Sequence, residues 1–289
     1  MIKKVTLIGV GSMGTGIAQN ILKAGFDLTA HNRTVAKTEP LARLGAKVAA
    51  DLHEAVWDAD IVISMVADDA ASRQVWLGGT GALNSARKET IVVESSTLSH
   101  TWVRELASLA AERGLAFLDA PVNGGPSVAV AGQLKMMVGG KAEVLDRARH
   151  VFESFTEQIT HIGPNGAGAM TKLVNNLMGG VQMVALAEAL NMAERAGLNL
   201  EQVVSVITNS GPASPLVKRN APLMAARNYG EPNFLLRHIR KDIAYALRLA
   251  EDVDASLTTA NAAREVYRMA GKLGYDDADF ASVFEALHH

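Results

Sequence analysis

A glycine-rich turn near the amino terminus constrains the fold more than any other stretch. An apolar run at residues 5–9 leads into G-V-G-S-M-G at 9–14, and an amphipathic helical pattern follows to residue 25. A G-x-G-x-x-G pattern alone is weak, but between a strand and a helix it is typical of a dinucleotide-binding unit. The alternative is a glycine-rich turn that binds no ligand.

Each glycine of this turn has an expected physical role. Gly9 permits a tight turn, Gly11 lets the backbone approach a pyrophosphate, and Gly14 allows the helix to pack closely. The positive end of the helix dipole then faces the phosphates. The cofactor contacts predicted in this turn are Gly9, Val10, Gly11, Ser12, Met13 and Gly14.

The second expected strand, residues 27–31, ends in Asn32-Arg33-Thr34. A site selective for NAD usually has a carboxylate here, about 20 residues past the glycines, to bind the ribose hydroxyls. This chain has none, and a guanidinium beside a hydroxyl suits a 2′-phosphate. We therefore expect Asn32, Arg33 and Thr34 to contact the cofactor and NADP(H) to be favoured over NAD(H). The alternative is a solvated loop arginine.

Short apolar runs and helical patterns alternate as far as residue 162, which predicts an α/β, Rossmann-like doubly wound sheet that is mostly parallel. Ligands of such sheets bind beyond the carboxyl ends of the strands. Three expected loops fall there: Met65-Val66-Ala67, Ser95-Ser96-Thr97 and 119–125. Within the last, Asn123-Gly124-Gly125 could turn backbone N–H groups inward as a seat for a carboxylate, or could be only a flexible turn.

A long apolar helix is expected at about 166–196, with no charged residue between Lys172 and Glu188. A buried lysine whose pKa is lowered can act as an acid or base near neutral pH, and Asn176 shares its helix face. Alternatively, the lysine stem packs while its head reaches water. Only helical patterns follow, so we expect a dinucleotide domain at 1–163 and an all-α domain at 164–289, the latter for substrate binding and dimerisation.

The composition excludes several classes of function. With 28 basic and 30 acidic residues the net charge is -2, which does not favour nucleic acid or an anionic membrane. No cysteine is present, and the 8 histidines are scattered without an H-E-x-x-H pair, so no metal site is expected. The start of the chain has no signal-peptide pattern, and asparagine and glycine residues interrupt the long helix. We expect a soluble, cytoplasmic protein.

Several stretches together resemble the β-hydroxyacid dehydrogenase family, the relatives of 3-hydroxyisobutyrate dehydrogenase and tartronate semialdehyde reductase. The resemblance covers essentially the whole chain. The stretches that carry it are GVGSMGTGIAQNILKAG at the amino terminus, ESST at 94–97, DAPVNGG at 119–125, GAGAMTKLVNN at 166–176 and KD at 241–242.

This resemblance implies roles for individual residues. Lys172 matches the catalytic lysine of the family, and Asn176 matches an asparagine that positions the substrate. Ser96 and Asn123-Gly124-Gly125 match substrate-contacting positions, and Phe234 matches a residue that closes the pocket. Thr97 and Lys241 match residues near the nicotinamide. The resemblance also implies a homodimer or homotetramer that associates through the helical domain.

The expected reaction is hydride transfer between NADP(H) and a small 3-hydroxy acid or semialdehyde, with Lys172 as general acid and base. Asn123 departs from the family, which usually has serine there, so the acceptor pattern around the substrate differs. An imine reductase and a non-catalytic dinucleotide-binding scaffold are the alternatives. The exact substrate, the stereochemistry and the physiological direction stay open.

Overall fold

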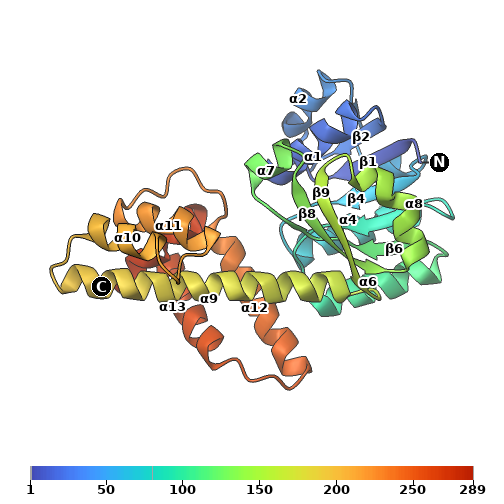
Figure 1. Cartoon of the computed structure of the whole chain (residues 1–289). Coiled ribbons are helices and arrows are strands. Elements are labelled where there is room, and N and C mark those ends of the chain that lie inside the picture. Colours follow the sequence, from blue (N-terminus) through green and yellow to red (C-terminus); the bar gives the residue numbers. More distant parts are fainter. Residues whose placement is uncertain (1, 80, 289) are drawn as a thin grey trace. The chain divides into compact units, whose positions relative to one another are not determined.

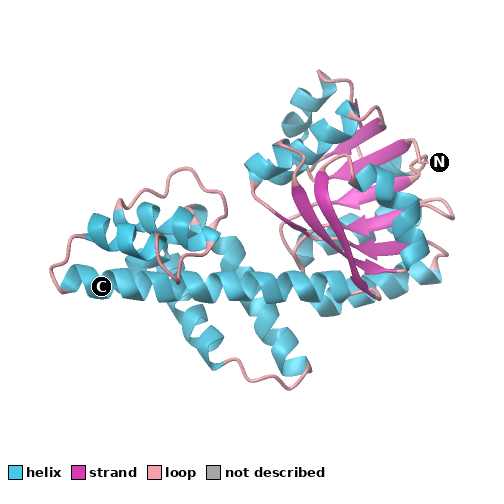
Figure 2. Cartoon of the chain, viewed as in Figure 1, coloured by secondary structure: helices cyan, strands magenta, loops and turns pink. Residues whose placement is uncertain are grey.

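The structure is a computed structural model that describes residues 2–79 and 81–288. It divides into two compact units, Met1–Lys172 and Leu173–His289, and the boundary along the chain falls within the long helix α9 (Ala167–Arg195). Figure 1 colours the chain by sequence and Figure 2 by secondary structure. The expected domain limits at 163 and 164 stay a prediction.

One sheet forms the centre of the N-terminal unit, with helices on both of its faces (Figure 2). Among the described residues the sheet has nine strands in the order β3-β2-β1-β4-β5-β6-β8-β7, and β9 pairs with β8. The strands are β1 (Lys4–Ile8), β2 (Asp27–His31), β3 (Lys47–Val48), β4 (Ile61–Ser64), β5 (Ile91–Glu94), β6 (Ala116–Asp119), β7 (Val122–Asn123), β8 (Leu134–Gly140) and β9 (Thr156–Gly163).

The expected α/β class and doubly wound sheet are confirmed. Strands β1 to β6 pair in parallel, whereas β8 runs antiparallel to both β6 and β7. The helices of this unit are α1 (Ser12–Lys23), α2 (Glu39–Ala42), α3 (Leu52–Val56), α4 (Asp69–Leu77), α5 (Ala82–Ser85), α6 (His100–Glu112), α7 (Pro126–Val130) and α8 (Ala142–Phe152), together with the 3₁₀ turn η1 (Val35–Thr38).

The central strands are apolar on both sides, as a sheet covered by helices on each face requires. Leu7, Ile63 and Val93 belong to one buried cluster, while Val62 and Val92, their neighbours along β4 and β5, belong to the cluster on the opposite face. The carboxyl ends of β4, β5 and β6 are therefore held in register, with Ser64 beside Glu94 and Glu94 beside Asp119. This register positions the three loops that follow these strands.

The C-terminal unit is helical and has its own apolar core. Asn199 caps α10 by accepting a hydrogen bond from Gln202 N at 3.0 Å. The last helical element is a 3₁₀ helix. Besides part of α9, the elements are α10 (Leu200–Thr208), α11 (Pro215–Ala225), α12 (Leu236–Asp252), α13 (Thr258–Lys272), η2 (Tyr275–Asp277) and η3 (Phe280–Leu287).

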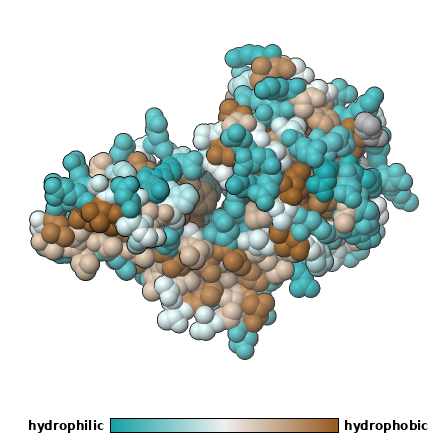
Figure 3. Space-filling model, in the orientation of Figure 1, coloured by the Kyte–Doolittle hydropathy of each residue, from teal (hydrophilic) through white to brown (hydrophobic). Residues whose placement is uncertain are grey.

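The long helix has an exposed apolar side that the sequence did not predict. Leu173, Met183 and Leu190 are buried, but Val174 is 60% exposed, Met178 68% and Met192 71%. Because the helix is apolar on all sides, its sequence does not indicate which side packs. Figure 3 shows apolar atoms at the surface of the C-terminal unit.

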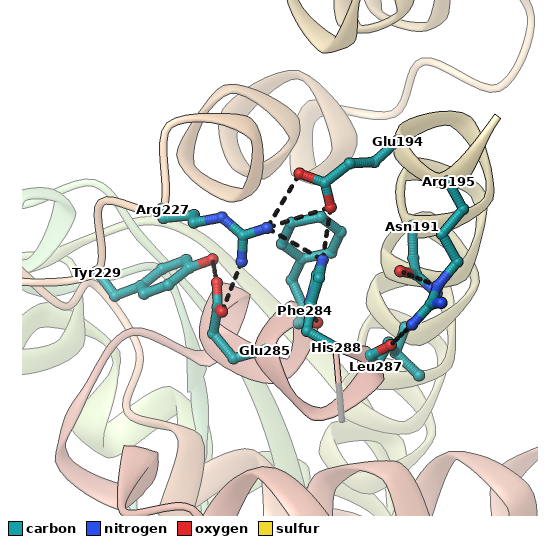
Figure 4. Close-up of polar contacts among 9 residues, drawn as sticks. All are labelled: Asn191, Glu194, Arg195, Arg227, Tyr229, Phe284, Glu285, Leu287 and His288. Carbon is teal, nitrogen blue, oxygen red and sulfur yellow. Dashed lines mark hydrogen bonds and ion pairs between the residues drawn. The ribbon is translucent and has the colours of Figure 1, made fainter. Parts of the chain in front are cut away.

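A polar cluster ties the carboxyl end of the chain to α9 (Figure 4). The guanidinium of Arg227 bonds Glu285 at 2.7 Å and Glu194 at 3.0 Å. The Tyr229 hydroxyl donates to the other oxygen of Glu285 at 2.6 Å. The cluster therefore anchors η3 to α9 within this unit.

Candidate active site and cofactor site

The glycine turn between β1 and α1 has the geometry that the motif predicts. Gly9 has φ +97°, and a Cβ there would lie 2.1 Å from the Met65 carbonyl oxygen. A Cβ at Gly14 would lie 2.0 Å from the Gly9 carbonyl oxygen. Both positions exclude a side chain because backbone atoms occupy the space.

Gly11 differs from its two neighbours, since a Cβ there would meet no atom of the chain within 4 Å. Gly11 is also the N-cap of α1, without a side-chain cap, and the first turn of α1 has no acidic residue. The first-turn N–H groups of a helix lack intrahelical acceptors and favour an anion. The turn thus has open space and donors where the pyrophosphate of a dinucleotide would be bound.

Asn32 holds this turn to the end of β2. Its Oδ1 accepts from Val10 N at 2.9 Å, and its Nδ2 donates to the Thr34 carbonyl oxygen at 2.9 Å. Arg33 and Thr34 are exposed beside it, while Val10 is buried. The structure therefore brings the predicted cofactor residues of the two loops together, with Asn32 as the link.

Gly16 was not singled out from the sequence. A Cβ there would lie 2.7 Å from Val130 N, so the absence of a side chain lets α1 pack closely against α7. Asn20 Nδ2 supports this packing by donating to the Ala129 carbonyl oxygen at 2.9 Å. The sequence signal for this close packing is the glycine itself, two residues beyond the G-x-G-x-x-G motif.

The loops after β4 and β5 are joined through Ser96. Its hydroxyl oxygen accepts from Val66 N at 2.8 Å, and its own N–H donates to Glu94 Oε1 at 3.0 Å. Ser96 is only 2% exposed, whereas Thr97 is half-buried. The cofactor loop predicted at 65–67 and the substrate loop predicted at 95–97 are therefore in direct contact.

Asp119, which sequence reasoning missed as a functional residue, anchors the helix that carries Lys172. Its Oδ1 accepts from Gly166 N at 2.7 Å and its Oδ2 from Ala169 N at 2.8 Å. Burial raises the pKa of Asp119 to about 6, and hydrogen bonds from the backbone N–H groups oppose this shift. The carboxyl end of β6 thus fixes the start of α9 less than one turn before Lys172.

Lys172 lies close to the glycine-rich loop after β6. It is buried, and its Nζ donates to Asn123 Oδ1. Gly124, next to Asn123, has φ +126°, and a Cβ there would lie 2.7 Å from Leu134 Cδ2. The loop is more ordered than expected, because Val122–Asn123 forms β7 and Gly125 is the N-cap of α7. An anion seat at 123–125 stays a prediction.

The remaining predicted residues lie in the C-terminal unit. Asn176 Nδ2 donates to Asp242 Oδ2 at 2.7 Å, and Lys241 Nζ lies 3.0 Å from Asp242 Oδ1. Asp242 is 1% exposed, so Lys241-Asp242 is a buried ion pair rather than a solvated one. Phe234 packs edge-to-face on Phe280, at 5.6 Å between ring centroids.

The predicted residues thus form two groups. The N-terminal unit contains the glycine turn, the loops after β4, β5 and β6, and Lys172, while the C-terminal unit contains Asn176, Phe234 and Lys241. Helix α9 connects the groups along the chain, with Lys172 and Asn176 four residues apart. The buried carboxyls Glu94, Asp119 and Asp242 were not predicted as site residues.

Two other features of the described residues bear on the site. A surface cavity of about 710 Å³ lies at the amino ends of β4 and β5, on the side of the sheet where α/β proteins do not usually bind ligands; its lining includes Asp60, Arg87 and His150. In the described chain, no group of three or more His, Asp or Glu residues is placed to hold a metal ion.

Comparison with known proteins matches both parts of the chain to domains of dehydrogenases. Residues 4–163 match the NAD binding domain of 6-phosphogluconate dehydrogenase, and residues 166–287 match the NAD-binding family of NADP-dependent 3-hydroxyisobutyrate dehydrogenase. An NAD-dependent L-serine dehydrogenase of Pseudomonas aeruginosa is 36% identical, over 97% of this chain and 96% of the relative.

Two further relatives support the same assignment to dehydrogenases. A chloroplastic glyoxylate/succinic semialdehyde reductase 2 of Arabidopsis thaliana is 33% identical, over 98% of this chain and 79% of its own length. The structure of a Mycobacterium tuberculosis 3-hydroxyisobutyrate dehydrogenase with L-serine superposes with a TM-score of 0.90, at 32% identity and full coverage of both chains. The chain therefore belongs to the β-hydroxyacid dehydrogenase family and is an NAD(P)-dependent oxidoreductase that acts on a CH–OH group.

Proposed function

We propose that this enzyme catalyses reversible hydride transfer between NADP(H) and a small, carboxylate-bearing 3-hydroxy acid or semialdehyde, with Lys172 as general acid and base. The observation that carries the proposal is a buried ammonium group whose helix is anchored to the carboxyl end of the sheet. Lys172 donates to Asn123, and Asp119 fixes the start of α9. The bound nicotinamide supplies or accepts the hydride.

Lys172 supplies the proton in this scheme. In reduction its ammonium donates a proton to the developing alkoxide, and in oxidation its neutral amine accepts the hydroxyl proton. The carbonyl oxygen of Asn123 accepts from Nζ, which directs one of its N–H groups toward the loop after β6. We propose that a substrate oxygen bound beside this loop exchanges its proton with the same nitrogen.

Asn123 also bears on the substrate class. Its Oδ1 accepts from Lys172, its Nδ2 is a hydrogen-bond donor, and donors suit a carboxylate oxygen. The relatives named for L-serine, glyoxylate and succinic semialdehyde point to the same small carboxylates. We expect Gly124 and Gly125 to hold the same carboxylate, and Ser96 to contribute to that site.

The C-terminal unit supplies the remaining proposed contacts. Asn176 is proposed to orient the reacting oxygen, and its position is held by Asp242. Phe234 is proposed to close the pocket, while Thr97 and Lys241 are proposed to lie near the nicotinamide. Lys241 is paired with Asp242, so one buried carboxyl supports both Asn176 and Lys241.

The cofactor preference rests on the end of β2. Arg33 is exposed there beside Asn32 and Thr34, with no acidic side chain among the three. A guanidinium pairs well with a 2′-phosphate, which favours NADP(H). Against this stands the 36%-identical relative named as NAD-dependent. A direct comparison of NADPH and NADH is therefore required.

We further propose a soluble homodimer or homotetramer that associates through the helical unit. Among the described helices, α9 is long and apolar enough to span a bilayer, with 39% of the relevant window buried. Asn175 and Asn176 lie within this helix, which suits a core helix of a soluble protein better than a membrane span. Its exposed Val174, Met178 and Met192 suit burial by a second copy. A cytoplasmic location and the absence of nucleic-acid partners stay predictions.

The test is oxidation of NADPH and NADH with a panel of small semialdehydes and 2-oxo acids, together with oxidation of L-serine and 3-hydroxyisobutyrate. Turnover of at least one carboxylate-bearing substrate, and none of cyclic imines, supports the proposal. Turnover of imines alone favours an imine reductase. Cofactor binding without turnover of any of these compounds favours a non-catalytic scaffold.

A further inference from the structure

The carboxyl of Glu94 is buried at the end of β5, and within residues 2–79 and 81–288 no cation pairs with it. Its Oε2 accepts from Ser72 Oγ at 2.6 Å and from Trp76 Nε1 at 2.8 Å. Its Oε1 accepts from Ser96 N at 3.0 Å. Every polar contact of Glu94 thus leads to α4 or to the loop after β5.

The Ser96 hydroxyl extends this chain of contacts to the neighbouring loop. Its oxygen accepts from Val66 N at 2.8 Å, and the residue is 2% exposed. A carboxyl, a hydroxyl and a backbone amide are therefore linked in series, from the end of β5 to the loop after β4. The position of the Val66 amide depends on where the Ser96 hydroxyl is held.

The charged groups on the elements packed around Glu94 bind other residues. Arg73 on α4 bonds Glu105 on α6, and its guanidinium lies 3.9 Å from the ring centroid of Trp102. Asp69 on α4 bonds Ser99, and Asp119 on β6 bonds the start of α9. His100 on α6 follows Glu94 closely in sequence and is buried. Burial raises the pKa of Glu94, because these groups supply no counter-ion.

The two oxygens of the Glu94 carboxyl bind different elements. Oε2 accepts from Ser72 and Trp76 on α4, while Oε1 accepts from Ser96 N at 3.0 Å. Because Ser96 Oγ in turn accepts from Val66 N at 2.8 Å, the place of Ser96 decides the place of that acceptor.

We propose that Glu94 is a positioning residue for the cofactor loop Met65-Val66-Ala67, which it holds through the Ser96 hydroxyl. The inference rests on the proposed function, in which this loop contacts the dinucleotide. It also assigns Ser96 a second task besides substrate contact. Glu94 itself touches neither substrate nor cofactor in this scheme.

Glu94→Gln is the informative substitution because it preserves size and replaces one carboxyl oxygen by an amide nitrogen. The amide nitrogen can donate but cannot accept. Whichever way the amide turns, either Ser96 N or Trp76 Nε1 therefore loses its acceptor. Ser72→Ala is the matched control, since it removes a partner of Oε2 and leaves Ser96 in place.

The experiment titrates NADPH and NADH by fluorescence against wild type, Glu94→Gln, Ser96→Ala, the double variant and Ser72→Ala. We expect Glu94→Gln and Ser96→Ala each to raise the cofactor Kd about tenfold, a typical effect of one lost buried hydrogen bond. The double variant should be no weaker than either single variant, because both act through one contact. Ser72→Ala should lower the melting temperature and leave Kd within about twofold.

The outcomes distinguish the proposed function from the positioning role of Glu94. Absence of cofactor binding by wild type overturns the proposed function and this inference with it. Intact wild-type binding with an unchanged Kd in Glu94→Gln, or additive effects in the double variant, overturns the inference alone. If Glu94→Gln does not fold, Ser96→Ala decides, since an unchanged Kd in that variant contradicts the link to Val66.

Discussion

Asp119→Asn tests how the sheet holds the catalytic helix. Burial raises the pKa of Asp119 from its ordinary value of 3.8 to about 6. At about 1.36 kcal/mol per unit, the folded state then loses about 3 kcal/mol of stability as the carboxyl ionises. Because the folded pKa is raised, this stability is fully present below about pH 3.8 and is lost as the pH rises to about 6.

The substitution replaces one carboxylate oxygen by an amide nitrogen, which cannot accept from both Gly166 N and Ala169 N. One backbone N–H at the start of α9 is left without its acceptor, at a cost of about 1–3 kcal/mol. Lys172 follows Ala169 by three residues, so we also expect kcat to fall about tenfold or more.

The assay is urea unfolding of wild type and Asp119→Asn between pH 4 and pH 8. All 3 tryptophans, Trp57, Trp76 and Trp102, lie in the N-terminal unit, so their fluorescence reports on the unit that contains Asp119. The free energy of unfolding of wild type, minus that of the variant, should fall by a few kcal/mol between pH 4 and pH 7. A difference that stays constant over this range would refute the reasoning.

Three further predictions concern the site. Gly11→Ala should fold normally yet bind NADPH at least about tenfold more weakly. Gly14→Ala should lower the melting temperature, because of these two positions only Gly14 has backbone atoms where the new Cβ would lie. Equal melting temperatures of the two variants would contradict this. Arg33→Ala should raise the KM for NADPH about tenfold and leave that for NADH unchanged; equal effects on both would show that Arg33 does not bind the 2′-phosphate. Asn123→Ser should shift the ratio of kcat/KM values among the substrates, because a hydroxyl replaces the amide that contacts Lys172; an unchanged ratio would remove Asn123 from substrate recognition.

The sheet could be predicted because its evidence is local. Strand β2 occupies 27–31 as the apolar pattern indicates, and Gly9 and Gly14 fit backbone positions that exclude side chains. The family resemblance singled out Lys172, and the structure shows it buried against Asn123. Short elements escaped prediction: β7 has two residues and is defined by its pairing with β8.

The roles of Asp119 and Asp242 could not be recognised, because their partners are distant in sequence. Asp119 binds N–H groups 47 and 50 residues away, and Asp242 binds an amide 66 residues away. The exposed side of α9 was missed for a different reason. Its composition is apolar all round, so periodicity does not tell which face packs within one chain.

The measurement that tests the central claim most directly is single-turnover reduction by wild type, Lys172→Met and Lys172→Arg, with the NADPH Kd of each determined in parallel. The account predicts that Lys172→Met keeps its cofactor Kd and loses at least about 10²-fold in rate, the contribution of a general acid. Lys172→Arg should be similarly impaired, because a guanidinium does not release its proton at neutral pH. A Lys172→Met enzyme that turns over as fast as wild type would contradict the assignment of Lys172 as the proton donor.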